Sequence, residues 1–313
     1  MTGATKLTPA FVPLEPRPVP RPWGGRRIAQ RFGWDASEPC GEWWLASCYP
    51  GTETALRDGS GDLARWLDGP GRSLGCPAAA DFPVLLKFLD AEEVLSLQVH
   101  PDDAVARAHG LPNGKTEAWH ILDADPDAEV YIGTAQGVSC AQLLDSIEAG
   151  ATDDDIRSMM NRVNVRAGDT VFVGAGTIHA LAGGVSLFEV QQNSDATYRI
   201  HDWGRGRQVH LAETRDAMID GPPPTPSNPT LAADAWTSLV DCDVFRLDRA
   251  RPDGSLGFDP DGSFGLLTVL AGEGHVHGSE SSAPLVPGDT LLVLEPVRVE
   301  GDTLDLLAVQ PGR

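Results

Sequence analysis

The 313-residue sequence lacks the features that would place it in a membrane or outside the cell. It contains no run of about 18 apolar residues, the length that a membrane-spanning helix needs, and its first residues lack the charged-then-apolar plan of a signal peptide. Its five cysteines are odd in number, scattered, and never at C-x-x-C spacing, so neither a disulfide framework nor a thiolate zinc site is indicated. We therefore expect a cytoplasmic protein.

Positive charge is also scarce, and lysine is the scarcest source of it. The formal net charge is −21, which would repel nucleic acid and anionic membranes. No cluster of basic and aromatic residues offsets this charge, so neither partner is expected. Only Lys6, Lys87 and Lys115 are lysine, against 21 arginines. Because a lysine ammonium is compact and shifts its pKa readily, these positions indicate tasks that a guanidinium cannot perform.

Glycine and proline, by contrast, are abundant. The 34 glycines and 25 prolines, together with many short apolar runs, favour a mainly β protein dense in turns. A hydrophobic content of 41% with 22% charged residues is typical of a globular protein. The length is sufficient for two domains that each bury a core.

The order of predicted elements divides the chain into two domains. Residues 1–220 are expected to form the larger domain, which includes an extended N-terminal arm and a helical insertion at about 139–161. Residues 221–229 are a proline-rich linker, and residues 230–313 form a smaller second domain. The phrase Ala-Gly-Asp-Thr-Val-Phe-Val at 167–173 returns as Pro-Gly-Asp-Thr-Leu-Leu-Val at 287–293, which suggests one architecture used twice.

Short strands are predicted throughout both domains, with few helices between them. In the first domain they fall at residues 42–47, 84–89, 94–100, 117–122, 129–134, 163–165, 170–173, 185–191 and 197–201. In the second they fall at 235–247, 264–270, 274–277, 284–294 and 303–309. Outside the insertion, helices are predicted at residues 63–67, 101–110 and 211–219.

Four polar residues on three of these strands have the side chains of metal ligands: Gln98, His100, Glu117 and His179. They occur as Gln-x-His, Lys-x-Glu and Thr-x-His, and residues two apart in a strand point to the same face. Burying such groups without partners would cost about 1–3 kcal/mol each. Two imidazoles, a carboxylate and an amide oxygen suit a divalent metal, with zinc the first choice. A lone histidine or glutamate would indicate nothing of the kind, so the joint pattern carries the prediction.

Several segments resemble one known family. They are residues 95–102, 114–119, 168–180, 188–199 and 202–205, with 21–25 and 41–44 nearer the N-terminus. Together they closely resemble class I mannose-6-phosphate isomerase, a cupin-superfamily enzyme, in its shorter bacterial form. The similarity runs from about residue 17 to 219. It implies a cupin-type jelly-roll metalloenzyme. Together with the repeated phrase, this predicts two cupin-type jelly-roll β-barrel domains, the second without a complete metal site. The implied activity is a zinc-dependent interconversion of mannose 6-phosphate and fructose 6-phosphate through an enediolate.

The resemblance also implies roles for individual residues. By match to the family motif, the four metal-ligand residues would hold one Zn²⁺ per chain, with another divalent metal as the alternative. Lys115 and Arg199 match residues implicated in catalysis, and Asp195 matches an acidic residue proposed for the active site. Ser96 and Lys87 match residues near the substrate phosphate. The sequence departs from the family at Gly174, where proline is more common, and at His201, where tyrosine is common.

The chemistry of aldose–ketose isomerisation suits these residue types. A proton moves between neighbouring carbons through an enediolate, whose negative charge a metal and Arg199 would both stabilise. Like charge nearby is expected to lower the pKa of Lys115 and fit it for acid–base catalysis, although Asp195 or a metal-bound water remain alternative bases. Lys87 lies in an apolar strand and needs an anionic partner, and it could meet Ser96 at one end of the barrel.

Two alternative functions stay open at this point. The same scaffold could isomerise another sugar phosphate, or it could be a non-catalytic, metal-binding cupin that binds sugar phosphates. A second metal site at His275 and His277 is disfavoured, because no histidine follows Pro287-Gly288-Asp289 to complete it. The expected partner is a small-molecule sugar phosphate, and the expected state is a monomer or homodimer.

Overall fold

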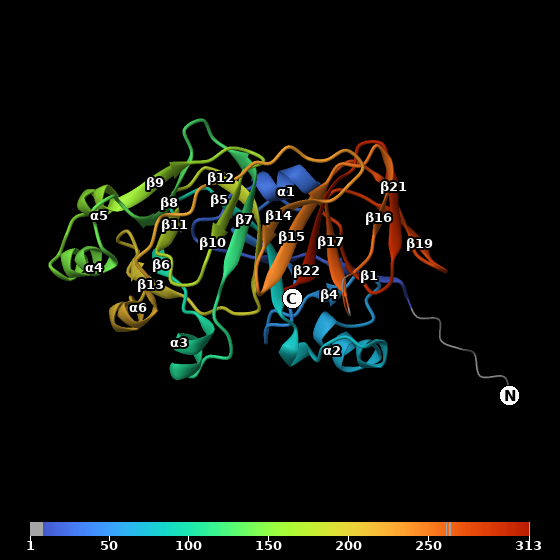
Figure 1. Cartoon of the computed structure of the whole chain (residues 1–313), viewed down its shortest axis with the longest axis horizontal. Helices are drawn as coiled ribbons and strands as arrows, with labels where there is room; N and C mark the ends of the chain where they lie inside the picture. The colour runs from blue at the N-terminus through green and yellow to red at the C-terminus, as the bar shows by residue number, and fades with distance from the viewer. Residues whose placement is uncertain (1–8, 261, 263, 313) are drawn as a thin grey trace. The chain divides into compact units, whose positions relative to one another are not determined.

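The computed structural model describes residues 9–260, 262 and 264–312. Its strands form four antiparallel sheets, and short helices occur between the strands along the chain (Figure 1). The prediction of a mainly β fold of cupin type with a helical insertion is confirmed. None of the helices in this part of the chain is long and apolar enough to cross a membrane.

The chain divides into two compact units that are not contiguous in sequence. Unit 1 comprises the described residues within Met1–Arg17, Trp44–Leu85 and Pro229–Arg313, and unit 2 comprises Pro18–Trp43 and Leu86–Asn228. The last change of unit, between Asn228 and Pro229, falls at the end of the proline-rich segment. Unlike the contiguous domains expected from the sequence, unit 1 therefore also contains residues from the first third of the chain.

Unit 2 is built on two antiparallel sheets. The six-stranded sheet has the order β10 (Thr170–Val173), β7 (Glu117–Ala124), β12 (Val185–Gln192), β5 (Val84–Ala91), β3 (Glu42–Ala46) and β2 (Arg17–Val19). The five-stranded sheet has the order β13 (Tyr198–His201), β6 (Leu97–Val99), β11 (His179–Leu181), β8 (Glu129–Thr134) and β9 (Met160–Asn164). Side chains from both sheets, including Trp119, Val130 and Leu187, share one buried core. The two sheets are thus the walls of a jelly-roll barrel.

The helical insertion packs on the five-stranded sheet. Helices α4 (Cys140–Glu148) and α5 (Asp153–Met159) lie beside β8 and β9 (Figure 1). Both begin with a capping box. The side chain of the N-cap residue, Ser139 or Thr152, accepts a hydrogen bond from the backbone N–H of the third helical residue, whose side chain accepts one from the N-cap backbone N–H. The other helices of this unit are α1 (Arg27–Phe32), α3 (Asp103–Ala108) and α6 (Leu211–Ala217).

Unit 1 is a second pair of antiparallel sheets. The larger has the order β14 (Thr237–Asp241), β15 (Phe245–Ala250), β22 (Asp305–Pro311), β17 (Gly265–Ala271), β20 (Thr290–Val293), β1 (Phe11–Glu15) and β4 (Ala55–Leu56). The smaller has the order β16 (Gly254–Phe258), β21 (Val297–Gly301), β18 (Gly274–His277) and β19 (Ser282–Leu285). Helix α2 (Leu63–Asp68) is followed by two 3₁₀ turns, η1 (Pro70–Leu74) and η2 (Ala79–Asp81).

Unit 1 also shows where the predicted elements are wrong. Residues 11–15 are expected to lie in an extended arm, but they form β1, which pairs with β20. The segments 235–247 and 284–294 each contain two strands rather than one. Strands β16 and β21 are not predicted at all. The sequence of β16 contains two glycines among five residues, whereas the Val-Arg-Val-Glu alternation of β21 is a strand signal that the prediction missed.

The repeated seven-residue phrase forms the same turn in both units. Gly168 and Gly288 have positive φ angles of 92° and 91°, which glycine adopts without strain. Asp169 then accepts a hydrogen bond from the Arg166 backbone at 3.0 Å, and Asp289 accepts one from the Val286 backbone at 2.9 Å. The echo in the sequence therefore corresponds to one structural device used twice.

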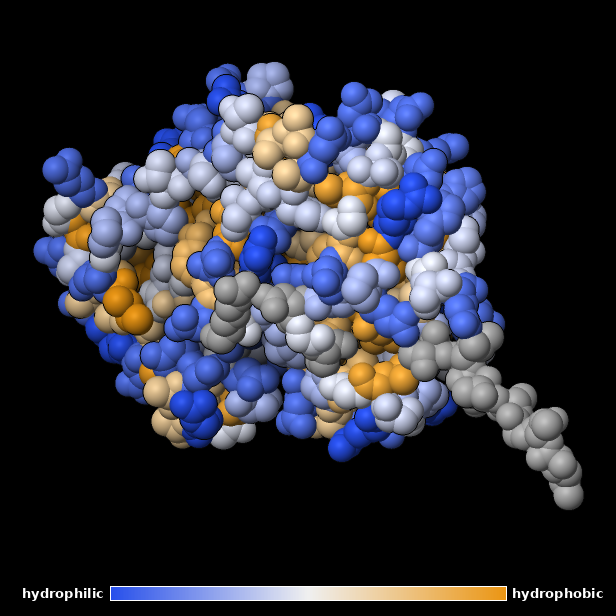
Figure 2. Space-filling model, turned by 45° about the vertical axis from the view of Figure 1, so that its right-hand side comes forward, coloured by the Kyte–Doolittle hydropathy of each residue, from blue (hydrophilic) through white to orange (hydrophobic). Residues whose placement is uncertain are grey.

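The surface mixes polar and apolar residues. Figure 2 shows one face, on which apolar residues occur as separate patches among hydrophilic ones. Within the described ranges, the exposed large hydrophobic side chains are Phe172, Val209, Ile219 and Val286. All five cysteines are free thiols, four of them buried.

Candidate metal centre and active site

The two sheets of unit 2 bring the predicted metal ligands together. His179 on β11 pairs directly with Gln98 on β6, and Glu117 begins β7 in the facing sheet. His100 follows the end of β6. One ligand atom each from His100, Glu117 and His179 lies within 4.8 Å of the others, and all three residues are buried. The structure thus brings these three predicted ligands together, and their role in holding a metal stays a prediction.

Hydrogen bonds orient both imidazoles toward the carboxylate. His100 donates from Nδ1 to the Ala196 carbonyl at 2.8 Å, and His179 donates from Nδ1 to the Thr177 carbonyl at 2.9 Å. Because a carbonyl can only accept, the proton is on Nδ1 and the lone pair is on Nε2. Each Nε2 lies 3.4 Å from a Glu117 oxygen. Such backbone partners fix metal-binding histidines in the required tautomer.

Burial keeps these imidazoles neutral. It lowers the pKa of His100 well below the usual value, with help from the nearby positive charge of Lys115. It lowers the pKa of His179 to about 4. A neutral imidazole is the form that binds a metal, so no proton has to leave before an ion enters near neutral pH.

The residues present fit a divalent cation. Within the described chain, Glu117 Oε1 is a buried oxygen without a hydrogen-bond partner. An unsatisfied buried acceptor costs about 1–3 kcal/mol, and more when it is charged. A carboxylate beside two Nε2 lone pairs is a donor set that zinc commonly takes. A cation among these atoms would therefore satisfy the unpartnered oxygen.

Gln98 is half-buried at the edge of this cluster. Its amide nitrogen lies 3.2 Å from His179 Nε2, and its oxygen accepts from the Ser96 hydroxyl at 3.4 Å. A half-turn of the amide would exchange the two atoms and bring the oxygen toward the histidines. Gln98 is therefore within reach of the centre, and its role as a ligand stays a prediction.

Lys115 lies against the cluster, but its electrostatic environment differs from the one expected. Its ammonium contacts Glu117 Oε2 and donates to His100 Nε2 at 3.1 Å. Burial acts to lower the pKa of Lys115, yet the carboxylates of Glu117, Glu189 and Asp195 outweigh it and raise that pKa. The expected lowering is wrong, because the nearest charges are negative and Arg199 is not among the dominant ones.

Lys87 has the anionic partners that its buried strand position requires, and they belong to the protein. Its nitrogen lies 3.8 Å from Glu42 and 3.6 Å from Glu189. Glu189 also accepts from the Trp119 indole at 3.2 Å, and Glu42 accepts from Arg21 at 2.9 Å. Burial raises the pKa of Glu189. Neither glutamate was singled out from the sequence, although an acidic residue inside the apolar run 187–190 is a signal that could have found Glu189.

The predicted catalytic and phosphate-contacting residues all line one cavity of about 300 Å³ in unit 2. They are Lys87, Ser96, Lys115, Asp195 and Arg199, and Gln98 from the metal-ligand set lines it too. Residues not predicted from the sequence also contribute, among them Arg21, Glu189, Arg207 and His210. Residues far apart in the chain thus converge on a single space beside the candidate metal centre.

Two arginines add positive charge to this cavity. Arg199 donates from Nη1 to the Gln208 carbonyl at 2.8 Å, while its Nε is buried without a hydrogen-bond partner among the described residues. Burial and the neighbouring Arg207 lower the pKa of Arg199. Arg207 itself is held by Asp202, with Nε to Oδ1 at 3.0 Å. By contrast, His201 bonds Asp153 at 2.8 Å and does not line the cavity.

The fold and the site together define the class of protein to which this chain belongs. A jelly-roll barrel with a buried His–Glu–His cluster inside it is a cupin-type β protein with a candidate metal centre. Polar and charged side chains line a cavity beside the cluster, a lining that suits a small polar ligand.

Comparison with known proteins identifies the family. Residues 13–129 match the model of the phosphomannose isomerase type I catalytic domain. The chain is 34% identical over 301 residues to mannose-6-phosphate isomerase of Streptococcus mutans, covering 91% of this chain and 93% of that protein. It is 32% identical over 299 residues to mannose-6-phosphate isomerase ManA of Bacillus subtilis, covering 90% and 92%. The chain belongs to the type I phosphomannose isomerase family of enzymes, as its sequence motifs indicate.

A solved structure agrees with this assignment. The crystal structure of mannose 6-phosphate isomerase from Bacillus subtilis matches with a TM-score of 0.84 and 28% identity. The match covers 96% of this chain and all of that one, so it includes both units.

Proposed function

We propose that this protein interconverts mannose 6-phosphate and fructose 6-phosphate with the help of a bound divalent metal, zinc in the first instance. The observation that carries the proposal is the buried cluster of His100, Glu117 and His179 beside a cavity lined by Lys115 and Arg199, in a chain of this family. Isomerising another sugar phosphate, or binding one without turnover, are the alternatives that the experiment below separates.

The metal would be held by His100, Glu117 and His179, with Gln98 as a fourth ligand. When bound, it supplies Lewis acidity that stabilises negative charge on the substrate oxygens. The backbone carbonyls of Ala196 and Thr177 fix the two imidazoles, so the ligand set is formed before the ion arrives.

The side chains around the cavity would move the proton and balance its charge. One group must take a proton from the carbon beside the carbonyl and return it to the neighbouring carbon. Lys115 and Asp195 both line the cavity and are the candidate groups. The carboxylates of Glu117, Glu189 and Asp195 raise the pKa of Lys115 and so favour its protonated form. Arg199, which lines the cavity, would stabilise the enediolate with the positive charge of its guanidinium.

A dianionic phosphate needs more positive charge than Lys87 alone can provide. Lys87 and Ser96 remain the proposed phosphate contacts, but Lys87 is already flanked by Glu42 and Glu189. Arg207, which lines the same cavity, is a further candidate because its guanidinium could bind a phosphate through two parallel hydrogen bonds. These contacts suit a small sugar phosphate, which is the proposed partner. The cytoplasmic location and the monomeric or homodimeric state stay predictions.

The test is turnover by the purified protein. Mannose 6-phosphate is supplied to the zinc-loaded protein, to the chelated protein and to the chelated protein given zinc again, and fructose 6-phosphate is followed by a coupled assay. We expect activity that chelation abolishes and zinc restores. Absence of turnover at every metal loading would refute the isomerase proposal, and binding of the sugar phosphate without turnover would support the non-catalytic alternative.

A further inference from the structure

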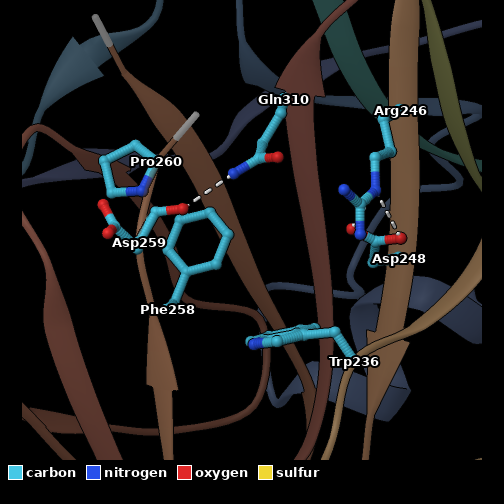
Figure 3. Close-up of a pocket in the computed structure, with 7 residues that line it drawn as sticks. All are labelled: Trp236, Arg246, Asp248, Phe258, Asp259, Pro260 and Gln310. Atoms are coloured by element: carbon cyan, nitrogen blue, oxygen red, sulfur yellow. Dashed lines mark hydrogen bonds and ion pairs between the residues drawn. The ribbon is translucent and has the colours of Figure 1, made fainter. Parts of the chain in front are cut away.

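Unit 1 contains a cavity of its own, none of whose lining residues belongs to the proposed isomerase site. It has a volume of about 300 Å³ and is lined by Trp236, Arg246, Asp248, Phe258, Asp259, Pro260 and Gln310 (Figure 3). All seven residues belong to unit 1. Small-molecule sites start at about this volume, so the cavity suits a single sugar ring better than a larger ligand. We call it the unit 1 pocket.

One wall of the unit 1 pocket is aromatic and held in place. The rings of Trp236 and Phe258 meet edge to face, with centroids 5.5 Å apart and planes at 64°. The Trp236 indole N–H donates to the Gly257 carbonyl at 2.8 Å, which fixes the ring. A face of the indole is turned toward the space that the labelled residues surround (Figure 3). The electron-rich face of an indole attracts the partly positive C–H groups of a sugar ring.

The opposite side of the pocket carries planar polar groups. Gln310 donates from Nε2 to the Asp259 carbonyl at 3.0 Å, and this bond leaves the amide oxygen directed into the pocket (Figure 3). Asp248 accepts from Arg246 Nε at 2.9 Å, and a terminal nitrogen of the guanidinium points into the pocket (Figure 3). Asp248 and Gln310 are only 3% and 6% exposed, so both groups are fixed parts of the fold.

The charge of the pocket selects among ligands. Arg246 and Asp248 cancel one another, and the chain as a whole carries −21, so nothing here favours an anion. An aromatic face opposite planar donors and acceptors matches a ring with a C–H face and hydroxyl groups at its edge. A nucleobase would prefer two parallel ring faces, whereas the edge-to-face arrangement of Phe258 offers only one.

We propose that the unit 1 pocket binds a neutral hexose, with the C–H face of the sugar on Trp236. Adjacent hydroxyls would bond to the Asp248 carboxylate and the Arg246 guanidinium, and a third would donate to Gln310 Oε1. The pocket is then a sugar-binding site separate from the cavity of unit 2, and it does not depend on the isomerase proposal.

The test uses methyl glycosides, because they cannot open and therefore cannot be isomerised. Methyl mannoside, methyl glucoside and methyl fructoside are titrated into the full-length protein, and binding is followed by saturation-transfer NMR and tryptophan fluorescence. We expect one of them to bind with a Kd on the order of 1 mM. Trp236→Ala should weaken it at least tenfold, and Trp236→Phe should weaken it less. Trp66→Ala, which changes another half-buried tryptophan of unit 1, should leave the Kd unchanged, as should Glu117→Gln in unit 2.

The activity of the variants provides a second readout. Trp236→Ala should keep wild-type isomerase activity, and circular dichroism shows whether it is folded; if it is not, Trp236→Phe alone decides the outcome. The proposal is overturned if no glycoside saturates the protein by about 50 mM. It is equally overturned if the tryptophan substitutions at 236 leave binding intact, or if Glu117→Gln abolishes it. Displacement of every glycoside from the pocket by adenosine or mannose 6-phosphate at a lower concentration would also overturn it, because the site would then prefer another class of ligand.

Discussion

Replacing Lys115 by methionine should make the protein bind its metal more tightly. The Lys115 ammonium contacts Glu117 and lies 3.1 Å from His100 Nε2, an atom expected to hold the ion. The ammonium and the ion are therefore two cations drawn to one carboxylate. Lys115→Met removes one of them and keeps much of the apolar volume.

The magnitude follows from burial. Lys115 is 5% exposed and Glu117 is 1% exposed, so the pair is fully buried. Removing one partner of a buried ion pair costs about 3–5 kcal/mol, which the metal-free variant should lose in its free energy of unfolding. With the metal bound, Glu117 keeps a cation and the loss should be smaller. A difference of about 1–3 kcal/mol corresponds to roughly 5–150-fold tighter metal binding.

The assay is competition for zinc between the protein and a chromophoric chelator at fixed pH, joined to urea unfolding with and without zinc. Lys87→Met is the matched control, because Lys87 is equally buried but contacts Glu42 and Glu189 instead of Glu117. We expect its zinc affinity to stay close to wild type. If Lys115→Met bound zinc no more tightly than the control, the two cations would not oppose one another and the reasoning would fail.

Three further predictions concern other parts of the molecule. Asp305→Ala should lower the free energy of unfolding by about 3–5 kcal/mol, because it leaves the buried Arg249 without its carboxylate partner. Arg251→Ala removes an arginine that is 60% exposed from an ion pair with the same carboxylate, and it should cost less than about 1 kcal/mol. Equal losses of the two variants in urea unfolding would contradict this. Arg199→Lys should lower kcat about 100-fold and leave the zinc affinity unchanged. Steady-state kinetics near wild type would show that Arg199 has no catalytic role. The pKa of His179 is lowered to about 4 in the folded protein, so as the pH falls the unfolded chain binds a proton at this residue before the folded protein does. The free energy of unfolding of the protein without metal should therefore decrease from about pH 6.5 toward pH 4. An NMR titration showing His179 protonated at pH 6 would be inconsistent with its burial.

The metal cluster was predictable because its signal is local. Residues two apart in an extended chain point to one side, which aligns Lys115 with Glu117 and Gln98 with His100, although Lys115 and His100 lie just outside β7 and β6. Side-chain chemistry then limits what such a face can bind. Local reasoning also placed the insertion helices, because the N-caps Ser139 and Thr152 act on their own first turns.

The features that the sequence did not reveal depend on contacts between distant segments. Glu189 reaches Lys87 only because β12 is placed beside both β7 and β5 in the sheet. The pKa of Lys115 depends on which charges lie nearest in space, and spacing along the chain indicated Arg199 instead of the carboxylates. The identity of β1 as a strand is likewise fixed by a partner almost at the other end of the chain. Neither periodicity nor composition carries such information.

The pairing of β1 with β20 also bears on how the protein is made. Phe11 is synthesised long before its partner Val293, so the large sheet of unit 1 cannot close until the strands that follow the proline-rich segment have been made. Unit 2 ends at Asn228 and can fold while the rest of the chain is still being added. The unit with the candidate metal centre is thus finished first, while an early hydrophobic strand waits unpaired, which makes the nascent chain vulnerable to aggregation during that interval.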